Sequence, residues 1–285
     1  MSEIIKIGFI DYYLDEWHAN NYPEFIRKAS GGKAAAVYAY GHIDSPKGGR
    51  TTEQWCKDLG LERCMTIDEV IEKSDCLIVL SPDNPEMHWE LCQKPLRSGK
   101  RVYVDKTFAP TAQIARDLFA LAEEYHTPVY SSSALRYTEQ FDDLPEKEPS
   151  FLLTYGPGLP ENYLVHQFEP LAMIMKAPAR KVMYTKAGEV ASYLFTFDGD
   201  KAASASLFGW SGPTPYMVTV RYTDGSMFQI PDASGYFDRF IAGMIHFFET
   251  GEGVVDKSET ISVMAMIEAA HKAEEKPGEW VDIDD

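Results

Sequence analysis

Short apolar strands alternate with helical segments through the first half of the chain, and this order most constrains the fold. The clearest unit is an apolar strand from Asp75, a helical segment closed by Gly99, and a second strand that ends at Asp105 and Lys106. Parallel strands joined by helices form a doubly wound sheet with right-handed crossovers. Ligands bind at the carboxyl ends of such strands, so Lys106 is a candidate for chemistry. From position alone, the alternative is an exposed cation in a loop.

Similar patterns extend this unit in both directions, up to about residue 133. Further strands are expected at Ile4–Asp11, Ala34–Gly41 and Pro128–Ser133. Helices are expected at Pro23–Ala29 with proline in the first turn, at Thr66–Lys73 with a capping box, from Asn84 towards Ser98, and from Thr111 onwards. These elements predict an α/β fold with a Rossmann-like parallel sheet.

The pattern changes after Arg136. Residues 141–150 are polar and rich in proline and acid, as in a hinge between domains. A helix over Leu164–Met175 is followed by alternating runs that predict an open, mainly antiparallel sheet, and two helices end the chain. The predicted runs are Lys181–Thr185, Val190–Asp198, Ala202–Phe208, Met217–Tyr222 and Ser226–Ile230. We therefore predict a Rossmann-like domain at residues 1–136 and an α+β domain at residues 137–285.

Composition excludes several classes of function. A net charge of -17 over 285 residues gives no basic surface for a nucleic acid and favours a neutral small molecule, such as a sugar or polyol, over an anion. No apolar run reaches the ~20 residues that cross a bilayer, and the N-terminal segment does not resemble a signal peptide, so a cytoplasmic protein without membrane attachment is expected. The four cysteines form no CxxC pair, so neither a metal site nor a disulfide framework is indicated.

Several motifs resemble the glucose-fructose oxidoreductase and inositol dehydrogenase family, known as Gfo/Idh/MocA. The matching segments are KIGFI from Lys6, DCLIVLSPD from Asp75 with the later His88, GKRVYVDKTFAPTA from Gly99, SSSALRY from Ser131, and LVHQFEPL from Leu164. Asp105-Lys106-Thr107 occupies the place of the family's Glu-Lys-Pro motif. The resemblance spans nearly the whole chain and implies a small-molecule dehydrogenase with NAD or NADP as cofactor.

The resemblance also assigns residues. It implies that Lys106 lies near the nicotinamide and the substrate hydroxyl, and that His166 exchanges the hydroxyl proton. The family's aspartate position is Asn162 here, which puts a carboxylate–histidine relay in doubt, and Glu169 matches a further acid on the same helix. Lys106 and His166 are expected to converge on one pocket. The expected cofactor contacts are Ser81, Pro82, Asp83, His88, Asp105, Lys106 and Asp44.

The segment after the first strand departs from a dinucleotide site. A diphosphate needs a Gly-rich turn there, but no glycine occurs between Gly8 and Gly31. Acids and bulky aromatic residues stand in its place, which argues against ordinary NAD binding. The same side chains suit a sugar, with rings against its apolar face and carboxylates accepting its hydroxyl protons; the alternative is that the rings fill the vacant cleft. The expected substrate contacts are Tyr12, Tyr13, Asp15, Trp17, Arg136 and Tyr137, the last two alternatively sealing the domain interface.

Two functions therefore stay open at this stage. The first is an NAD(P)-dependent oxidoreductase acting on a sugar or polyol, and the second is a cofactor-free member of the family that is a carbohydrate-binding protein, a lyase or an isomerase. The remaining histidines, including His18, are interpreted as structural. A homo-oligomer through the sheet of the second domain is also expected, because an open sheet leaves an apolar face.

Overall fold

The computed structural model describes residues 4–284 of the chain. The chain divides into two compact units that are interleaved in sequence. The first comprises Met1–Ala109, Gln113–Ser131 and Phe240–Lys257, and the second comprises Pro110–Ala112, Ser132–Arg239 and Ser258–Asp285. The sequence alone predicts one boundary, after residue 136.

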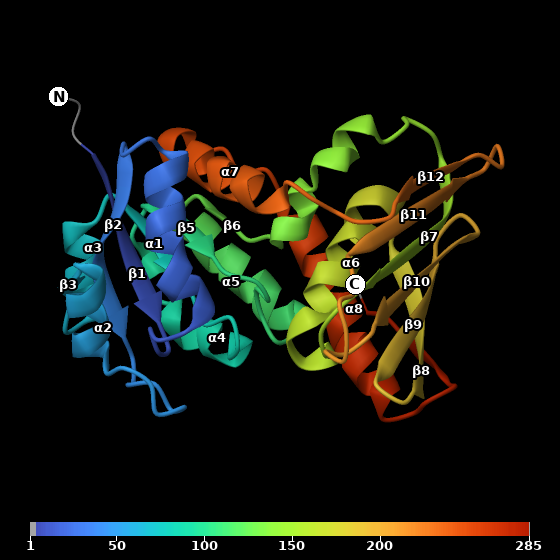
Figure 1. Cartoon of the computed structure of the whole chain (residues 1–285), viewed down its shortest axis with the longest axis horizontal. Helices are drawn as coiled ribbons and strands as arrows, with labels where there is room; N and C mark the ends of the chain where they lie inside the picture. Colours follow the sequence, from blue (N-terminus) through green and yellow to red (C-terminus); the bar gives the residue numbers. More distant parts are fainter. Residues whose placement is uncertain (1–3, 285) are drawn as a thin grey trace. The chain divides into compact units, whose positions relative to one another are not determined.

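A six-stranded parallel sheet forms the centre of the first unit (Figure 1). Its strands are β1 (Ile5–Asp11), β2 (Ala34–Gly41), β3 (Glu62–Arg63), β4 (Cys76–Val79), β5 (Arg101–Val104) and β6 (Val129–Tyr130). Their spatial order is β3-β2-β1-β4-β5-β6, and every neighbouring pair is parallel. This is the doubly wound order of a Rossmann fold, which confirms the predicted fold class.

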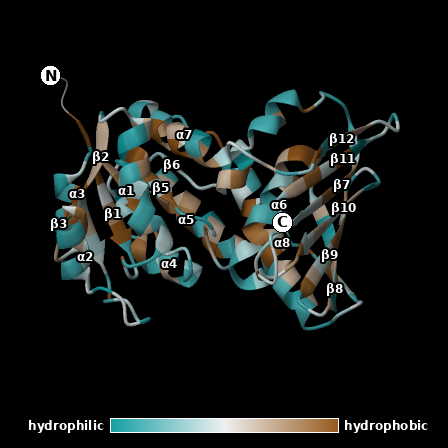
Figure 2. Cartoon of the chain, in the orientation of Figure 1, coloured by the Kyte–Doolittle hydropathy of each residue, from teal (hydrophilic) through white to brown (hydrophobic). Residues whose placement is uncertain are grey.

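Burial explains why these segments form the central strands. β4 is buried along its whole length, as is β1 from Ile7 onwards, and Figure 2 shows the hydrophobic residues on the strands of this sheet. Strands covered on both faces need such continuous apolar runs. Gly8 is required because a Cβ there would lie 2.3 Å from side-chain atoms of both Val70, in the helix over Ile67–Lys73, and Ser74, which follows that helix.

The helices of the first unit differ from the predicted ones in three places, one of which is the unpredicted helix over residues 52–59. They are α1 (Trp17–Ala29), α2 (Thr52–Leu59), α3 (Ile67–Lys73), α4 (His88–Leu91) and α5 (Ala112–Glu124). The predicted start of α1 at Pro23 was wrong, because Glu16 caps the helix and Pro23 lies inside it. The predicted helix over 84–98 is three short segments, Pro85–Met87, α4 and Pro95–Arg97, and the side chain of Asn84 makes no cap.

Helix α7 (Tyr236–Thr250) contributes to the first unit although it lies more than a hundred residues after β6. The ring of Phe240 lies 6.1 Å from that of Tyr22 and 5.7 Å from that of Tyr103. The guanidinium of Arg101 donates to the Phe248 carbonyl at 2.7 Å. The helical spacing of apolar residues predicts this helix, but the sequence does not show with which unit the helix packs.

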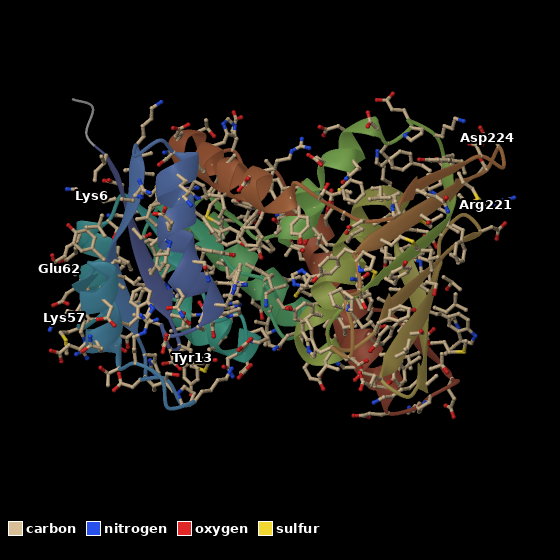
Figure 3. All side chains as sticks on the ribbon, viewed as in Figure 1. Lys6, Tyr13, Lys57, Glu62, Arg221 and Asp224 are labelled. Atoms are coloured by element: carbon tan, nitrogen blue, oxygen red, sulfur yellow. The ribbon has the colours of Figure 1, made fainter. Side chains whose placement is uncertain are left out.

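The second unit contains a seven-stranded sheet in the order β12-β11-β7-β10-β9-β8-β13. Its strands are β7 (Pro149–Gly156), β8 (Ala179–Ala187), β9 (Val190–Phe197), β10 (Lys201–Leu207), β11 (Met217–Tyr222), β12 (Met227–Ile230) and β13 (Trp280–Asp282). Only β7 and β10 pair in parallel, which confirms a mainly antiparallel sheet. Figure 3 labels Arg221 and Asp224, which mark the β11–β12 hairpin. Neither β7 nor β13 is predicted from the sequence.

Helices α6 (Pro160–Met175) and α8 (Lys257–Glu274) cover one face of this sheet (Figure 1). On β9, Tyr193 contacts both: its ring lies 5.6 Å from that of Phe168 in α6, and its hydroxyl donates to Glu274 in α8 at 2.6 Å. Among residues 4–284 no helix covers the other face, where Leu153 and Leu194 are half-buried. None of the helices in this range combines the length and the apolar character needed to cross a membrane.

Candidate functional site

The carboxyl edge of the first sheet brings together most of the predicted site residues of the first unit. Asp11 ends β1, while Ser81 and Asp83 follow β4 and Asp105 and Lys106 follow β5. Figure 3 marks the two ends of β1 by Lys6 near its start and Tyr13 just beyond its end. The sheet order reverses between β1 and β4, and in open α/β sheets the crevice at such a reversal is where ligands bind.

The glycines of a dinucleotide loop are replaced at every position. Counting from the end of β1, the spacing G-x-G-x-x-G falls on Asp11, Tyr13 and Glu16. All three side chains are buried, with 1%, 4% and 8% of their surface exposed. Glycine is needed at these positions so that the backbone can approach a pyrophosphate closely. Here side chains of the loop itself fill that space.

Glu16 also occupies the amino end of α1. Its carboxyl accepts hydrogen bonds from the backbone N–H groups of His18, at 2.6 Å, and of Ala19. These are the donors that bind phosphate at the start of the first helix in a Rossmann fold. The residues present therefore do not fit the pyrophosphate of NAD or NADP in its usual place.

Two buried carboxyl groups share this region without a direct cationic partner. Burial raises the pKa of Glu16 to about 7, against the opposing effect of His18. Burial, followed by the charge of Glu16, raises the pKa of Asp11 well above its usual range, and neither Asp11 oxygen has a hydrogen-bond partner. The nearby N–H groups of Tyr12 and Tyr13 only partly oppose this shift.

Two further acids hold the loop in place. Asp15, predicted as a substrate contact, forms an ion pair with Arg50 at 2.6 Å, which lowers the pKa of Asp15, and it also accepts from the Arg50 backbone at 2.8 Å. Asp44, predicted to hold the cofactor ribose, accepts from the backbone of Thr52 at 2.7 Å. Both carboxylates therefore form hydrogen bonds within the protein that hold the loop in place.

The side chains of His18 and Asp105 form a hydrogen-bonded pair at this edge. Nδ1 of His18 is hydrogen-bonded to Oδ2 of Asp105, which is fully buried. Burial would raise the pKa of Asp105, but His18, together with Lys106 and His88, outweighs it and the pKa is lowered. From the sequence alone, His18 was interpreted as a structural residue and was not among the predicted site residues. Its position directly after Trp17, within the loop predicted to contact substrate, is the signal that could have identified it.

Lys106 is buried on the same edge, with 7% of its surface exposed. Its ammonium donates to the Pro82 carbonyl at 3.2 Å. Beside it, Asp83 accepts from Lys47 at 2.9 Å and from the hydroxyl of Tyr13 at 3.3 Å. Burial opposes ionisation of Asp83, but Lys47 and Lys106 outweigh it and its pKa is lowered. An ammonium in this setting can polarise a ligand oxygen.

At this edge, the side chains of two other residues predicted to contact the cofactor form hydrogen bonds with backbone carbonyl groups. The Ser81 hydroxyl donates to the Asn84 carbonyl at 2.9 Å. His88 is fully buried, with its ring nitrogens 3.0 Å from the Phe108 carbonyl and 2.6 Å from the Leu80 carbonyl, and burial lowers its pKa. These contacts position the ends of β4 and β5. Within residues 4–284 no group of three or more His, Cys, Asp or Glu side chains is arranged to hold a metal ion.

The second unit holds the predicted residues of α6. His166 Nδ1 lies 2.7 Å from the hydroxyl of Ser133. Glu169 is buried and pairs with Arg136 at 2.7 Å, and Arg136 also contacts Glu259. Burial raises the pKa of Glu169, although Arg136 opposes the shift. Both of these charged side chains thus have partners within their own unit.

Around His166 the second unit is rich in aromatic rings. The ring of Tyr163 lies 5.1 Å from that of His166 and 4.8 Å from that of Trp210, which is 57% exposed. A cavity beside His166 is lined by Thr154, Gln167 and Tyr216 among others. Asn162 lies on the first turn of α6, and Tyr137 ends the short helix Ala134–Tyr137. Lys106 belongs to the first unit and His166 to the second, and their convergence stays a prediction.

One protein-family model matches a part of the chain that lies mainly in the first unit. Residues 23–132 match the Gfo/Idh/MocA family model, described as an oxidoreductase family with an NAD-binding Rossmann fold. The match begins after the loop that lacks the glycines. "Uncharacterized oxidoreductase YhhX" of Escherichia coli (strain K12) is 29% identical over 109 residues, which are 38% of this chain and 25% of that protein. The aligned region thus spans about a quarter of the curated relative.

Solved structures resemble the chain over nearly its full length. Myo-inositol dehydrogenase from Lactobacillus casei, in complex with NAD(H) and myo-inositol, gives a TM-score of 0.79 at 11% identity over 99% of this chain and 97% of that one. Scyllo-inositol dehydrogenase from the same organism, with bound NAD(H) and scyllo-inositol, gives 0.75 at 13% identity over 99% of each chain. An NAD binding oxidoreductase from Klebsiella pneumoniae gives 0.74 at 12% identity, over 99% and 100%. At these identities the likeness establishes the fold, and residues 23–132 resemble the Gfo/Idh/MocA oxidoreductase family in sequence.

Proposed function

We propose that this protein is a redox-neutral enzyme, an isomerase or lyase, that acts on a sugar, a polyol or a related hydroxylated molecule without a nicotinamide dinucleotide at the phosphate loop. The observation that carries the proposal is the position of Glu16. Its carboxyl takes up the N–H groups of α1 on which the cofactor pyrophosphate would depend. A diphosphate brought to this place would also meet the acid side chain of Asp11.

The substrate class is supported by two observations. The structurally similar inositol dehydrogenases are named for polyols. The strongly acidic chain gives no attraction for an anionic substrate, whereas the exposed ring of Trp17 at the loop offers an apolar face for a sugar. A neutral, hydroxyl-rich ligand fits both.

Lys106 supplies the electrostatic part of the chemistry. A buried ammonium at a strand end is held in place before the substrate arrives, so it stabilises negative charge on a carbonyl or hydroxyl oxygen without reorganisation. In an isomerisation, a base removes the proton from the carbon next to the carbonyl, and the proton returns to the neighbouring carbon. In an elimination the adjacent hydroxyl leaves as water. Neither reaction needs an external oxidant.

Cofactor titration of the purified full-length protein tests the proposal. Fluorescence and calorimetric titrations with NADH and with NADPH, up to millimolar concentrations, are expected to show no saturable binding. The comparison variant Glu16→Gly frees the N–H groups of His18 and Ala19, and circular dichroism checks that it is folded. Saturable binding of either cofactor to the unaltered protein contradicts the proposal.

A second candidate is an NAD(P)-dependent sugar or polyol dehydrogenase with Lys106 and His166 in the roles that the family resemblance implies. The match of residues 23–132 to an NAD-binding oxidoreductase family favours it. It requires the dinucleotide to bind in a way that avoids Glu16. The same titration separates the two candidates and, if binding occurs, distinguishes NAD from NADP.

We also propose that the protein forms a homo-oligomer through the uncovered face of the second sheet. Leu153 and Leu194 lie half-buried on this face, on strands that no helix covers within residues 4–284. Light scattering after size-exclusion chromatography is expected to give a multiple of 32.1 kDa, and Leu194→Asp is expected to shift it towards the monomer. A monomer at every protein concentration would refute this proposal.

A further inference from the structure

We propose that His18, oriented by Asp105, is the acid–base catalyst at the carboxyl edge of the first sheet, and that it acts on a hydroxyl-bearing ketone or aldehyde. The inference rests on the proposed function and names the group that would move the proton. The two proposals fail on different measurements: the first on cofactor binding, and this one on the properties of His18.

The contact with Asp105 fixes the tautomer of the His18 ring. An ionised carboxylate only accepts hydrogen bonds, so Nδ1 of His18 must carry the proton in their shared bond. In the neutral ring Nε2 then carries the lone pair and can accept a proton. The hydroxyl groups of Tyr103, at 3.3 Å, and of Tyr22, at 3.5 Å, approach the other oxygen of Asp105 and hold the carboxylate in place.

Aromatic neighbours fix the plane of the imidazole. The ring stacks on Tyr22 with centroids 5.1 Å apart and planes 11° apart, and the indole of Trp17 lies 5.4 Å away at 75°. The side chain is 15% exposed. Within residues 4–284, Nε2 makes no hydrogen bond. One nitrogen is thus held by a buried carboxylate while the other is available to a ligand.

Asp11 gives an independent indication of a ligand at this edge. Its carboxyl group is buried, both oxygens lack a hydrogen-bond partner, and its charge interacts with those of Glu16 and Asp105. Unsatisfied buried carboxyl groups are costly and occur mainly where a bound molecule or water completes them. A ligand hydroxyl beside His18 would supply the missing partner.

The proton transfer balances without a further reactant. Nε2 takes the proton from the carbon that carries a hydroxyl and lies next to a carbonyl. The electron pair of that C–H bond forms a C=C bond, and the π pair of the carbonyl moves onto its oxygen. Asp105 stabilises the imidazolium that forms, as the aspartate does in a Ser-His-Asp triad. In an isomerisation, His18 then returns the proton to the former carbonyl carbon, while the hydroxyl proton passes to the former carbonyl oxygen and the hydroxyl-bearing carbon becomes the new carbonyl. In an elimination, the carbonyl re-forms, a new C=C bond forms to the carbon on the far side of the deprotonated one, and the hydroxyl on that far carbon takes the proton from His18 and departs as water.

Solvent exchange measures this step directly. The full-length protein is incubated in D₂O with D-fructose and, separately, with 2-keto-myo-inositol, and proton NMR follows the C–H signals next to the carbonyl. Exchange is expected with at least one probe, and His18→Asn is expected to slow it by about 100-fold or more. Asparagine can keep a donor towards Asp105 but has no basic nitrogen. His126→Asn is the matched control, because His126 is exposed and its positive φ of 52° suits asparagine.

A second readout does not depend on turnover. Nitrogen NMR of the protein labelled in histidine is expected to show His18 protonated on Nδ1 only, with an Nε2 signal that moves when either probe is added. Asp105→Asn is expected to disturb this tautomer and to change the pH profile of exchange, which a purely structural pair would not do. The proposal is overturned if His18→Asn exchanges protons at the unaltered rate, if Nε2 carries the proton, or if neither probe exchanges or moves the signal.

Discussion

The edge of the first sheet and the middle of α6 in the second unit both contain buried carboxyl groups, but the partners of these groups differ. Around α6, the carboxylate of Glu169 meets the guanidinium of Arg136 at 2.7 Å. At the sheet edge, the Asp11 carboxyl has no hydrogen-bond partner, and the Glu16 carboxyl accepts only from backbone N–H groups at the amino end of α1. Uncompensated groups with shifted pKa values are typical of functional sites, whereas a matched pair is typical of structural support. The comparison therefore favours the first unit as the place of the chemistry.

Removal of the ammonium at the sheet edge is expected to give the largest effect. Lys106→Ala takes away the group that stabilises charge on the substrate oxygen, so the rate of proton exchange with 2-keto-myo-inositol should fall by about 100- to 1,000-fold. Lys100→Ala is the control. Lys100 lies just before β5, at the opposite end of this strand from Lys106, and it donates to the carbonyls of Ile71 and Ser74. An unchanged exchange rate in folded Lys106→Ala would remove this residue from the chemistry.

Removal of the cation beside α6 is expected to affect stability instead. Arg136→Ala leaves Glu169 buried without its partner, which should lower the free energy of unfolding by about 3–5 kcal/mol. Urea unfolding of the full-length protein measures this difference. The control Arg180→Ala removes an ion pair with Asp198 that is about half exposed on both sides, and its effect should be much smaller. Equal losses in the two variants would show that burial of the Arg136 pair does not matter.

The pH dependence of stability separates the two regions further. The folded protein holds a proton on Glu16 up to about pH 7, above the ordinary pKa of 4.5, so the folded state binds more protons than the unfolded state between these values. The contribution of Glu16 to stability is therefore fully present below pH 4.5 and is lost as pH rises towards 7. Glu16→Gln removes this group, so the fall in Tm between pH 5 and pH 8 should be smaller than in the unaltered protein. Parallel pH curves for the two proteins would contradict the raised pKa.

The sequence predicts the order of strands and helices well because this order depends on the local spacing of apolar residues. Thr66 is the N-cap as expected, with its hydroxyl accepting from the Glu69 backbone at 3.2 Å, but the Glu69 carboxylate accepts from the N–H of Met65 and so does not complete the predicted capping box. The central strands β1, β4 and β5 are apolar over their buried lengths, and their residues therefore identify them. The strand β7 was missed because its start, at Pro149, lies in a stretch that is polar and rich in proline.

The contacts of the candidate site were less predictable, since they depend on residues far apart in the sequence. His18 and Asp105 are 87 positions apart, and nothing in either neighbourhood indicates the pairing. The carboxylate of Asp15 could bind a sugar hydroxyl, yet in the structure it forms an ion pair with Arg50. The loss of the glycines, by contrast, was visible at once, because a backbone that must approach a phosphate tolerates no side chain.

The smallest expected effect concerns the aromatic ring beside His18. Trp17 is 54% exposed, so Trp17→Ala should change the free energy of unfolding by no more than about 0.5 kcal/mol. If its indole covers the apolar face of a sugar, binding of 2-keto-myo-inositol should weaken by about 3- to 10-fold, which corresponds to the ~0.5–1.5 kcal/mol of an aromatic contact. Calorimetric titration measures the change, with Trp89→Ala as the control because Trp89 is 44% exposed on α4 of the same unit. Equal affinities for the two variants would show that Trp17 is a surface residue and would place the ligand away from the amino end of α1.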